Sequence, residues 1–286
     1  MDEITEHTIG LIIGLILSAC VGLVFWKKGY YSKKLEGYKQ HVTLLPTLFA
    51  FFIYFAVQII IPLIVYFWVV KSGGSLTHLR EAWINLGIMY TTALAVILFS
   101  LLASKDVRTG VWNPKHLGQK GIIRSFFVGM VTWVQAWPLV LVVGEFMTLL
   151  LLVGFGIAPP DQDQEMIRYL KKFQDHPEIL YPLSLAVAFV IPVMEEILFR
   201  GFLQNFFTKM FGKIGAIGLT SLFFAALHFT PAQGSTNFLL LPALFLLSCF
   251  LGYLYERQGT LTAPIGLHMT FNSLTLLFLL ASFHWV

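Results

Sequence analysis

The stretch that decides the fold class is residues 44–70, which read LLPTLFAFFIYFAVQIIIPLIVYFWVV and contain no charged side chain. A run of about 20 apolar residues can cross a bilayer as an α-helix, because a helix satisfies its own backbone hydrogen bonds. The rest of the 286-residue chain has the same character, since 57% of its residues are hydrophobic and only 12% are charged. A soluble domain carries roughly 25% charged residues. The composition therefore excludes a large soluble domain and predicts an all-α, polytopic helical membrane protein.

Working outward from this run, the sequence predicts about eight transmembrane helices. The fourth is too long for one straight crossing, so we expect an interfacial helix followed by a span kinked at Pro138. Acidic residues rather than a basic stretch precede the first span, so we expect it to be uncleaved and not a secretory signal. The expected spans are 8–26, 44–70, 82–104, 122–157, 179–203, 214–230, 237–255 and 262–283.

The loop charges orient these helices. The loops after the first, third and fifth spans are basic, and basic loops of multi-pass proteins lie in the cytoplasm, so both chain ends are expected outside. The net charge of +4 then reflects topology and contact with the lipid bilayer rather than nucleic-acid binding. If the chain is bacterial, we expect it in the cell membrane. The basic loops hold Lys27, Lys28, Lys33, Lys34 and Lys39, then Lys105, Arg108, Lys115 and Lys120, then Lys209 and Lys213, whereas Asp161, Asp163, Glu165, Asp175 and Glu178 make another loop acidic.

Three ionisable side chains lie in the fifth span, where they should face protein or water because exposure to lipid is costly. Glu196 and Arg200 are four residues apart on a helix with the acid first, an order that favours pairing. Glu195 is rotated by about 100° from Glu196, so it can point elsewhere. One carboxylate is therefore predicted to be held by the arginine and the other to be available for chemistry. A buried ion network that only fixes helix packing is the alternative.

Two histidines are placed to meet this acid. If the fifth and sixth spans form a hairpin that turns at residues 211–213, Glu195 and His228 both lie about 25 Å from the turn. His268, in the eighth span, would lie about 10 Å inside the cytoplasmic boundary. The hairpin must then project roughly two to three turns into the cytoplasm for the three side chains to meet. We expect Glu195, His228 and His268 to converge in this way.

The three motifs resemble those of the CAAX protease and bacteriocin-processing family of intramembrane proteases, also called type II CAAX prenyl endopeptidases or abortive-infection proteins. They are Glu195-Glu196-x-x-x-Arg200, Phe224-x-x-x-His228 and His268-x-x-x-Asn272. The resemblance covers about residues 179–283, a CAAX-protease-like catalytic region, and leaves residues 1–157 as an N-terminal transmembrane region of unassigned role. It implies a membrane-embedded endopeptidase, a hydrolase, that opens to the cytoplasm. The implied roles are Glu195 as general base with help from His228, His268 and Asn272 as oxyanion donors, and Glu196 and Arg200 as structural or polarising partners.

The resemblance also implies a peptide or membrane-protein substrate, since the eukaryotic members cleave prenylated CAAX tails and bacterial members process other peptides. A zinc site formed by Glu195, His228 and His268 is an alternative, because such a set leaves a fourth position for water. The helical H-E-x-x-H pattern is absent, so we favour a glutamate mechanism without metal or other cofactor. Two further functions stay open, namely a secondary transporter with a carboxylate–histidine relay and a non-proteolytic membrane scaffold of the same family.

A few polar residues lie outside these motifs. Glu145 lies in an apolar run without a partner that the sequence can name, and His7 is expected at a solvated span end. Phe224 is expected to serve packing. The polar segment 230–237 follows His228 closely, and we expect it to border a water-accessible chamber, with an ordinary external loop as the alternative. Cys20 and Cys249 lie in apolar runs and indicate neither a disulfide nor a metal site.

Overall fold

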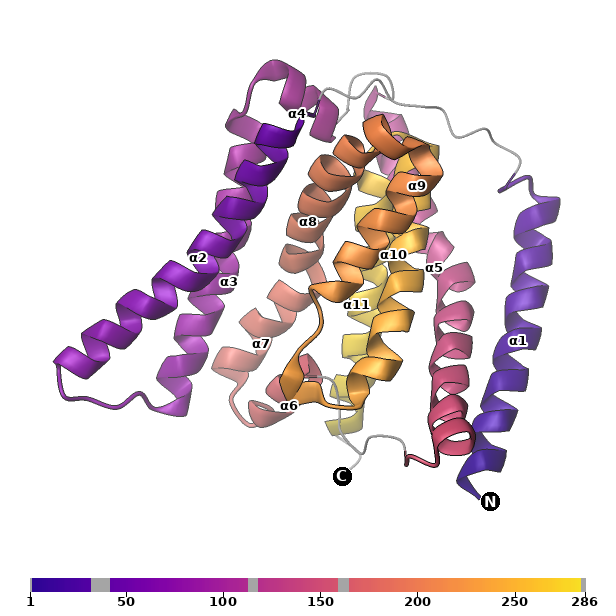
Figure 1. Cartoon of the computed structure of the whole chain (residues 1–286), viewed down its shortest axis with the longest axis horizontal. Coiled ribbons are helices and arrows are strands. Elements are labelled where there is room, and N and C mark those ends of the chain that lie inside the picture. Colours follow the sequence, from indigo (N-terminus) through magenta and orange to yellow (C-terminus); the bar gives the residue numbers. More distant parts are fainter. Residues whose placement is uncertain (1, 32–41, 113–117, 159–164, 284–286) are drawn as a thin grey trace.

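The protein is a multi-pass helical membrane protein in a computed structural model that describes residues 2–31, 42–112, 118–158 and 165–283 (Figure 1). The loop charges Lys33, Lys34, Lys39, Lys115, Asp161 and Asp163 lie outside these described residues. The elements, in chain order, are α1 (Glu3–Lys27), α2 (Leu44–Lys71), α3 (His78–Leu102), α4 (Lys105–Trp112), α5 (Gly118–Leu149), η1 (Leu150–Gly154), α6 (Glu165–Lys172), α7 (Pro177–Leu185), η2 (Ala186–Val190), α8 (Ile191–Glu196), η3 (Ile197–Gln204), α9 (Asn205–Ala226), η4 (Pro231–Gln233), α10 (Thr236–Gln258) and α11 (Thr262–Phe283). Of these, η1, η2 and η3 are π-helical and η4 is a 3₁₀ turn.

Within the described residues, 7 helical segments are long and apolar enough to cross a membrane. The number differs from the expected eight because the fifth and sixth expected spans form one helical segment, Pro177–Ala226. This segment reverses at Gly212, where φ is 67° and ψ is 176°. Glycine adopts this conformation without the steric cost that a Cβ atom would add. The two arms lie side by side as the predicted hairpin (Figure 1).

Local sequence signals fix several helix ends. The Asp2 side chain accepts a hydrogen bond from the Thr5 amide at 2.8 Å, and this N-cap starts α1. Gly259 ends α10 in the left-handed conformation, with a φ of 62°, as a C-terminal glycine commonly does.

The fourth expected span differs from the prediction in having no separate interfacial helix, whereas the kink expected at Pro138 stays a prediction. The helix α5 runs without interruption through Pro138 and continues into η1. No separate interfacial helix lies inside the described part of 122–157. The short helix of this region, α4, instead precedes α5 in the chain.

The helix α5 lies between α1 and α11 and packs along both. Two glycines permit the close approach to α11: a Cβ atom on Gly129 would overlap the carbonyl of Ala263, and one on Gly266 would overlap the carbonyl of Phe126. Small residues at such crossings let helix backbones approach each other closely in membranes. The helices α2 and α3 pack together and cover the α8–η3 arm from the other side.

The bundle has two ends that matter for the site (Figure 1). The hairpin end carries the Gly212 turn, α4 and the start of α11. The terminal end carries the start of α1, the end of α11, α6 and the loop with η4. Three helices that hold the candidate site residues, α8, α9 and α11, run between these ends.

Candidate active site

The predicted acid pair lies on a helix arm that is interrupted by π-helical turns. The π-helix η2 precedes the short helix α8, which ends with Glu195 and Glu196, and η3 follows directly. Such turns occur frequently at functional sites. Glu196 and Arg200 are fully buried, whereas the Glu195 side chain is 15% exposed.

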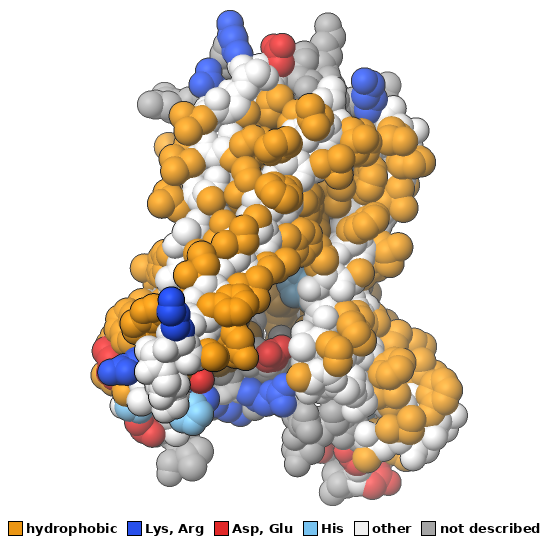
Figure 2. All heavy atoms as spheres, turned by 60° about the vertical axis from the view of Figure 1, so that its left-hand side comes forward, with side chains coloured by type: hydrophobic (Ala, Val, Ile, Leu, Met, Phe, Trp, Pro, Cys, Tyr) orange, Lys and Arg blue, Asp and Glu red, His pale blue; other side chains and the backbone are white. Residues whose placement is uncertain are grey.

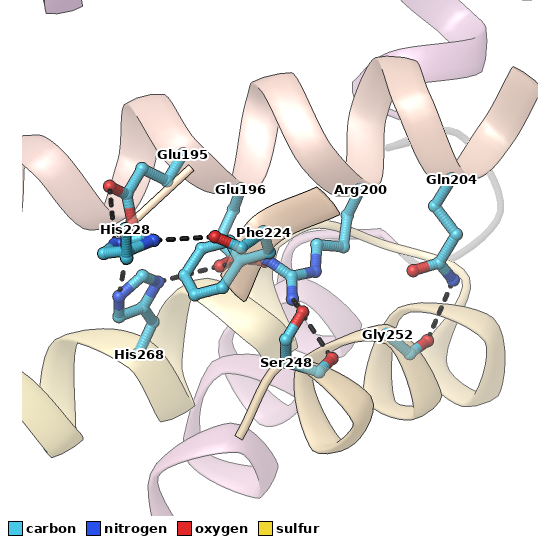
Figure 3. Close-up of polar contacts among 9 residues, drawn as sticks. All are labelled: Glu195, Glu196, Arg200, Gln204, Phe224, His228, Ser248, Gly252 and His268. Atoms are coloured by element: carbon cyan, nitrogen blue, oxygen red, sulfur yellow. Dashed lines mark hydrogen bonds and ion pairs between the residues drawn. The ribbon is translucent and has the colours of Figure 1, made fainter. Parts of the chain in front are cut away.

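Glu196 is held by the arginine, as predicted. Arg200 Nη1 donates to Glu196 Oε1 at 3.0 Å (Figure 3). The other guanidinium nitrogen, Nη2, donates to the carbonyl and the hydroxyl of Ser248 on α10, at 3.1 and 2.6 Å. The guanidinium carbon also lies 5.0 Å from the centroid of the Phe224 ring, within the range of a cation–π contact. These contacts fix Glu196 relative to α9 and α10.

Glu195 points to the two predicted histidines (Figure 3). His228 Nε2 lies 3.9 Å from Glu195 Oε1, and His268 Nε2 lies 3.6 Å from Glu195 Oε2. The three side chains come from α8, the residues directly after α9, and α11. The convergence expected from the sequence is therefore present in the structure. Both distances are longer than direct hydrogen bonds.

The hydrogen bond made by Nδ1 of each histidine determines which ring nitrogen carries the proton. His228 Nδ1 lies 2.7 Å from the carbonyl oxygen of Phe224, which can only accept, so Nδ1 must donate. His268 Nδ1 lies 2.8 Å from Glu196 Oε1, and a carboxylate paired with an arginine is also an acceptor. In the neutral form of each ring, Nε2 therefore presents a lone pair to Glu195.

Asn272 is turned to the backbone of the acid-bearing arm. Its Nδ2 donates to the carbonyl of Val187 at 2.9 Å. In the π-helical register of η2, where Ile191 donates to Ala186, the partner of that carbonyl would be residue 192, which is a proline without an N–H. Asn272 thus satisfies a carbonyl that Pro192 leaves unpaired. This is the interhelical bond that asparagine commonly forms in membranes, and the second amide hydrogen is the one that could serve an oxyanion.

Phe224 packs as predicted, and its place is central to the site. Its ring is 1% exposed and lies 4.6 Å from the ring of His228 and 6.0 Å from that of His268, measured between centroids. Phe199 contacts it edge-on at 4.9 Å. The ring therefore separates Arg200 from the two histidines.

A cavity of about 730 Å³ adjoins the site. Glu195, His228, His268 and Asn272 line one part of it. Figure 2 shows the molecule hollowed in its lower half, with a histidine visible inside the hollow. Other lining residues are Gln58 of α2, Asn85 of α3, Val140 of α5, Glu165 and Tyr169 of α6, and Thr230 and Gln233 of the loop after His228. The expectation that the polar segment 230–237 borders a chamber is confirmed, and helices from the first half of the chain contribute to its wall.

Glu195, His228 and His268 are also the residues that could hold a metal ion. Each Nδ1–H is held by an oxygen acceptor, as in histidines that bind zinc through Nε2. Among the described residues, however, no group of three or more His, Cys, Asp or Glu side chains is arranged to hold a metal ion.

Several residues of the site were not predicted. Gln204 Nε2 donates to the carbonyl of Gly252 at 3.1 Å and to Glu256 Oε1 at 3.0 Å, which extends the contact made by Arg200 and Ser248. The spacing of 196, 200 and 204 on the α8–η3 arm and of 248, 252 and 256 on α10 is a signal that the sequence contains. The pattern is recognisable only once this arm and α10 are known to face each other.

One expectation outside the motifs is corrected. His7 lies near the start of α1, as expected, but its side chain is only 27% exposed and its Nδ1 is 2.7 Å from Glu145 Oε2 on α5. Glu145 thus has a partner, which the sequence could not name because the two residues are 138 positions apart.

Comparison with known proteins supports the motif assignment. Residues 177–274 match the family model described as type II CAAX prenyl endopeptidase Rce1-like, so the resemblance is confirmed for the part of the chain that holds all three motifs. An uncharacterized 24.3 kDa protein of Escherichia coli is 33% identical over 153 residues, which are 52% of this chain and 64% of that protein. The chain therefore covers less than two thirds of this relative. No solved structure matches the chain significantly.

Proposed function

We propose that the protein is an intramembrane endopeptidase in which Glu195 activates the water molecule that hydrolyses a peptide bond. The observation that carries the proposal is the convergence of two imidazole Nε2 atoms on one partly exposed carboxylate at the wall of a large cavity. The family match over residues 177–274 supports the same reaction.

The first step is proton removal from water. Glu195 is the acceptor in this proposal, because the other carboxylate is occupied by Arg200 and His268. The Nε2–carboxylate distances of 3.6 and 3.9 Å suit groups that share a water molecule rather than bond directly. His228 Nε2 can accept a hydrogen bond from that water and orient its oxygen towards the carbonyl carbon of the substrate. The new C–O bond forms as Glu195 takes the proton.

The second requirement is a donor for the oxyanion that forms. His268 can donate from Nε2 only as an imidazolium, because Nδ1–H is already given to Glu196. The buried Glu196 carboxylate stabilises that positive charge, which explains why an acid behind the histidine is useful. The second amide hydrogen of Asn272 is the other candidate donor. Donors of this kind each contribute about 2.7–4 kcal/mol to catalysis. The C–N bond then breaks as the proton on Glu195 passes to the leaving amine.

The substrate we propose is a peptide with a membrane-embedded part. Most of the cavity lining is apolar, with residues such as Ile88, Met89 and Leu244 next to the polar groups. A peptide that carries an apolar segment or a lipid, prenylated tails included, suits such a wall.

The experiment is cleavage of internally quenched peptides by the purified protein in detergent, with one peptide set bearing a farnesyl group and another an apolar helix. Glu195→Gln keeps size and removes the base, so we expect cleavage to fall by about 10²–10⁴-fold. Glu178→Gln, at the exposed start of the same helix arm, is the matched control and should keep full activity.

A second arm of the experiment tests the metal alternative. Activity that survives chelation with 1,10-phenanthroline supports the glutamate mechanism. Loss of activity on chelation with recovery on added zinc would replace that mechanism by a metal-dependent one. Equal cleavage by wild type and Glu195→Gln would refute the proposed role of this acid.

A further inference from the structure

The charges at the two ends of the bundle differ in sign. In the described part of the chain, the hairpin end is strongly basic, and the terminal end carries more acidic than basic side chains. At the hairpin end lie Lys27, Lys28, Lys105, Arg108, Lys209, Lys213 and Arg257, against Asp106 and Glu256; at the terminal end lie Asp2, Glu3, Glu6, Glu81, Glu165, Asp175 and Glu178, against Lys71, Arg80, Arg168, Lys171 and Lys172. The positive-inside rule counts Lys and Arg residues near span ends. The sequence that joins α1 to α2 and α4 to α5 adds Lys33, Lys34, Lys39 and Lys115 to those of the hairpin end, and this excess assigns the hairpin end to the cytoplasm.

The cavity extends from the site to the opposite end. Its lining includes Glu165 and Tyr169 of α6, Gln233 of the loop before α10, and Asn85 near the start of α3. All of these elements lie at the terminal end (Figure 1). In Figure 2, which keeps the same vertical axis, the hollow likewise lies in the half away from the hairpin end.

The way from the site to the hairpin end is closed. Directly beyond Glu195 the arm contributes Glu196, Phe199, Arg200 and Phe202, whose exposed fractions are at most 4%. Phe224, at 1%, fills the space between this arm and the histidines. The polar contacts of Gln204 with α10 continue the closure farther along the arm. Within the described structure, the cavity at Glu195 therefore extends away from the hairpin end and not toward it.

We propose that the site takes its substrate from the extracytoplasmic side of the membrane. This narrows the substrates proposed above to a peptide segment exposed at that surface, such as the outer part of a membrane-anchored or exported peptide. A lipidated tail presented in the cytoplasm, which the apolar wall alone would accept, is then no longer a substrate. This reverses the opening that the family resemblance implies. The substrate class rests on the proposed peptidase function. The side of the membrane to which the cavity opens rests on geometry and charge alone.

The first test measures sidedness without activity. In a Cys20→Ala/Cys249→Ala background, Ala232→Cys places a thiol at the exposed part of the loop beside the cavity, and Lys209→Cys places one at the hairpin end. Spheroplasts of Escherichia coli expressing each variant are treated with a membrane-impermeant maleimide before and after permeabilisation. We expect Ala232→Cys to be labelled before permeabilisation and Lys209→Cys only after it. Glu178→Cys and Lys105→Cys form a second pair, for use if a first-pair variant does not accumulate. The opposite pattern, or labelling of both members of a pair from outside, would overturn the proposal.

The second test uses activity. Right-side-out and inverted vesicles receive the same internally quenched peptides from outside, and we expect cleavage only in right-side-out vesicles. Cleavage only in inverted vesicles would overturn the sidedness while leaving the peptidase function intact. Absence of cleavage in either preparation and in detergent would remove the peptidase function, and the labelling pattern would still decide the sidedness.

Discussion

Replacing Arg200 by methionine tests whether the buried ion pair holds the site together. Arg200 and Glu196 are both fully buried, and the guanidinium makes three hydrogen bonds, one to Glu196 and two to Ser248. Methionine has a similar length and no charge, so Arg200→Met removes the bonds without opening a large cavity. Glu196 then keeps only His268 as a hydrogen-bonding partner.

The expected cost follows from the charge that is left behind. Breaking a buried ion pair by removing one partner typically costs about 3–5 kcal/mol, because the remaining ion is neither hydrated nor neutralised. An interhelical hydrogen bond in a membrane contributes on average only about 0.6 kcal/mol, so the two bonds to Ser248 are the smaller part. His268 can take up a proton and compensate in part. We therefore expect a loss near the lower limit, about 3 kcal/mol, for the free energy of unfolding.

The double variant Glu196→Gln/Arg200→Met separates the contribution of the ion pair to stability from that of side-chain packing. Because it leaves no uncompensated charge, it should be more stable than the sum of the single variants predicts, by about 1–3 kcal/mol. Unfolding by increasing SDS in mixed micelles, followed by circular dichroism, measures each free energy. Arg124→Met, an exposed arginine on α5, is the control and should change stability by less than about 0.5 kcal/mol. Strict additivity of Glu196→Gln and Arg200→Met would refute the coupling on which the site geometry depends.

Three further variants test other contacts by the same SDS titration. Asn272→Asp turns a donor into an acceptor facing a backbone carbonyl and should cost about 1–3 kcal/mol; an unchanged midpoint would contradict the contact with η2. Gly252→Ala places a Cβ atom 2.7 Å from the side-chain oxygen of Gln204 and should lower the free energy of unfolding by about 1–3 kcal/mol. Gly218→Ala, where a Cβ atom meets nothing within 4 Å, is the control and should leave stability unchanged. Equal effects of the two variants would exclude close helix approach as the cause. Glu145→Gln should destabilise the protein by about 1 kcal/mol and be non-additive with His7→Ala, since additive losses would mean that α1 and α5 are not joined by this pair.

Most of the helices could be predicted because lipid imposes a simple rule on the sequence. A span must be apolar and about 20 residues long, so the runs 44–70 and 262–283 coincide with α2 and α11 almost residue for residue. The hairpin of the acid-bearing arm was likewise predictable, since the polar residues around Gly212 end one apolar run and start another.

Two kinds of feature were not predictable from the sequence. The π-helical turns of η2 and η3 leave no mark on hydropathy, because every residue in them suits a buried helix of either register. The pair of His7 and Glu145 depends on how α1 packs on α5, and a pattern within one helix cannot reveal a partner on another. The end of the bundle toward which the cavity extends was not predictable for the same reason, because it depends on where packed aromatic rings fill the space between helices.

The π-helical arm explains how one helix can serve both the chemistry and the packing. In an α-helix with 3.6 residues per turn, side chains four residues apart drift by about 40° per step around the axis. Glu196, Arg200 and Gln204 would then turn progressively away from a facing helix. The wider turns of η3 oppose this drift, so that Arg200 and Gln204 bond to α10 at Ser248 and Gly252, four residues apart. Glu195, one position earlier than Glu196, is consequently held on the cavity side of an arm whose opposite side is fixed by these contacts. Two adjacent carboxylates thus acquire different surroundings, one sealed among buried partners and one open to the cavity and its histidines.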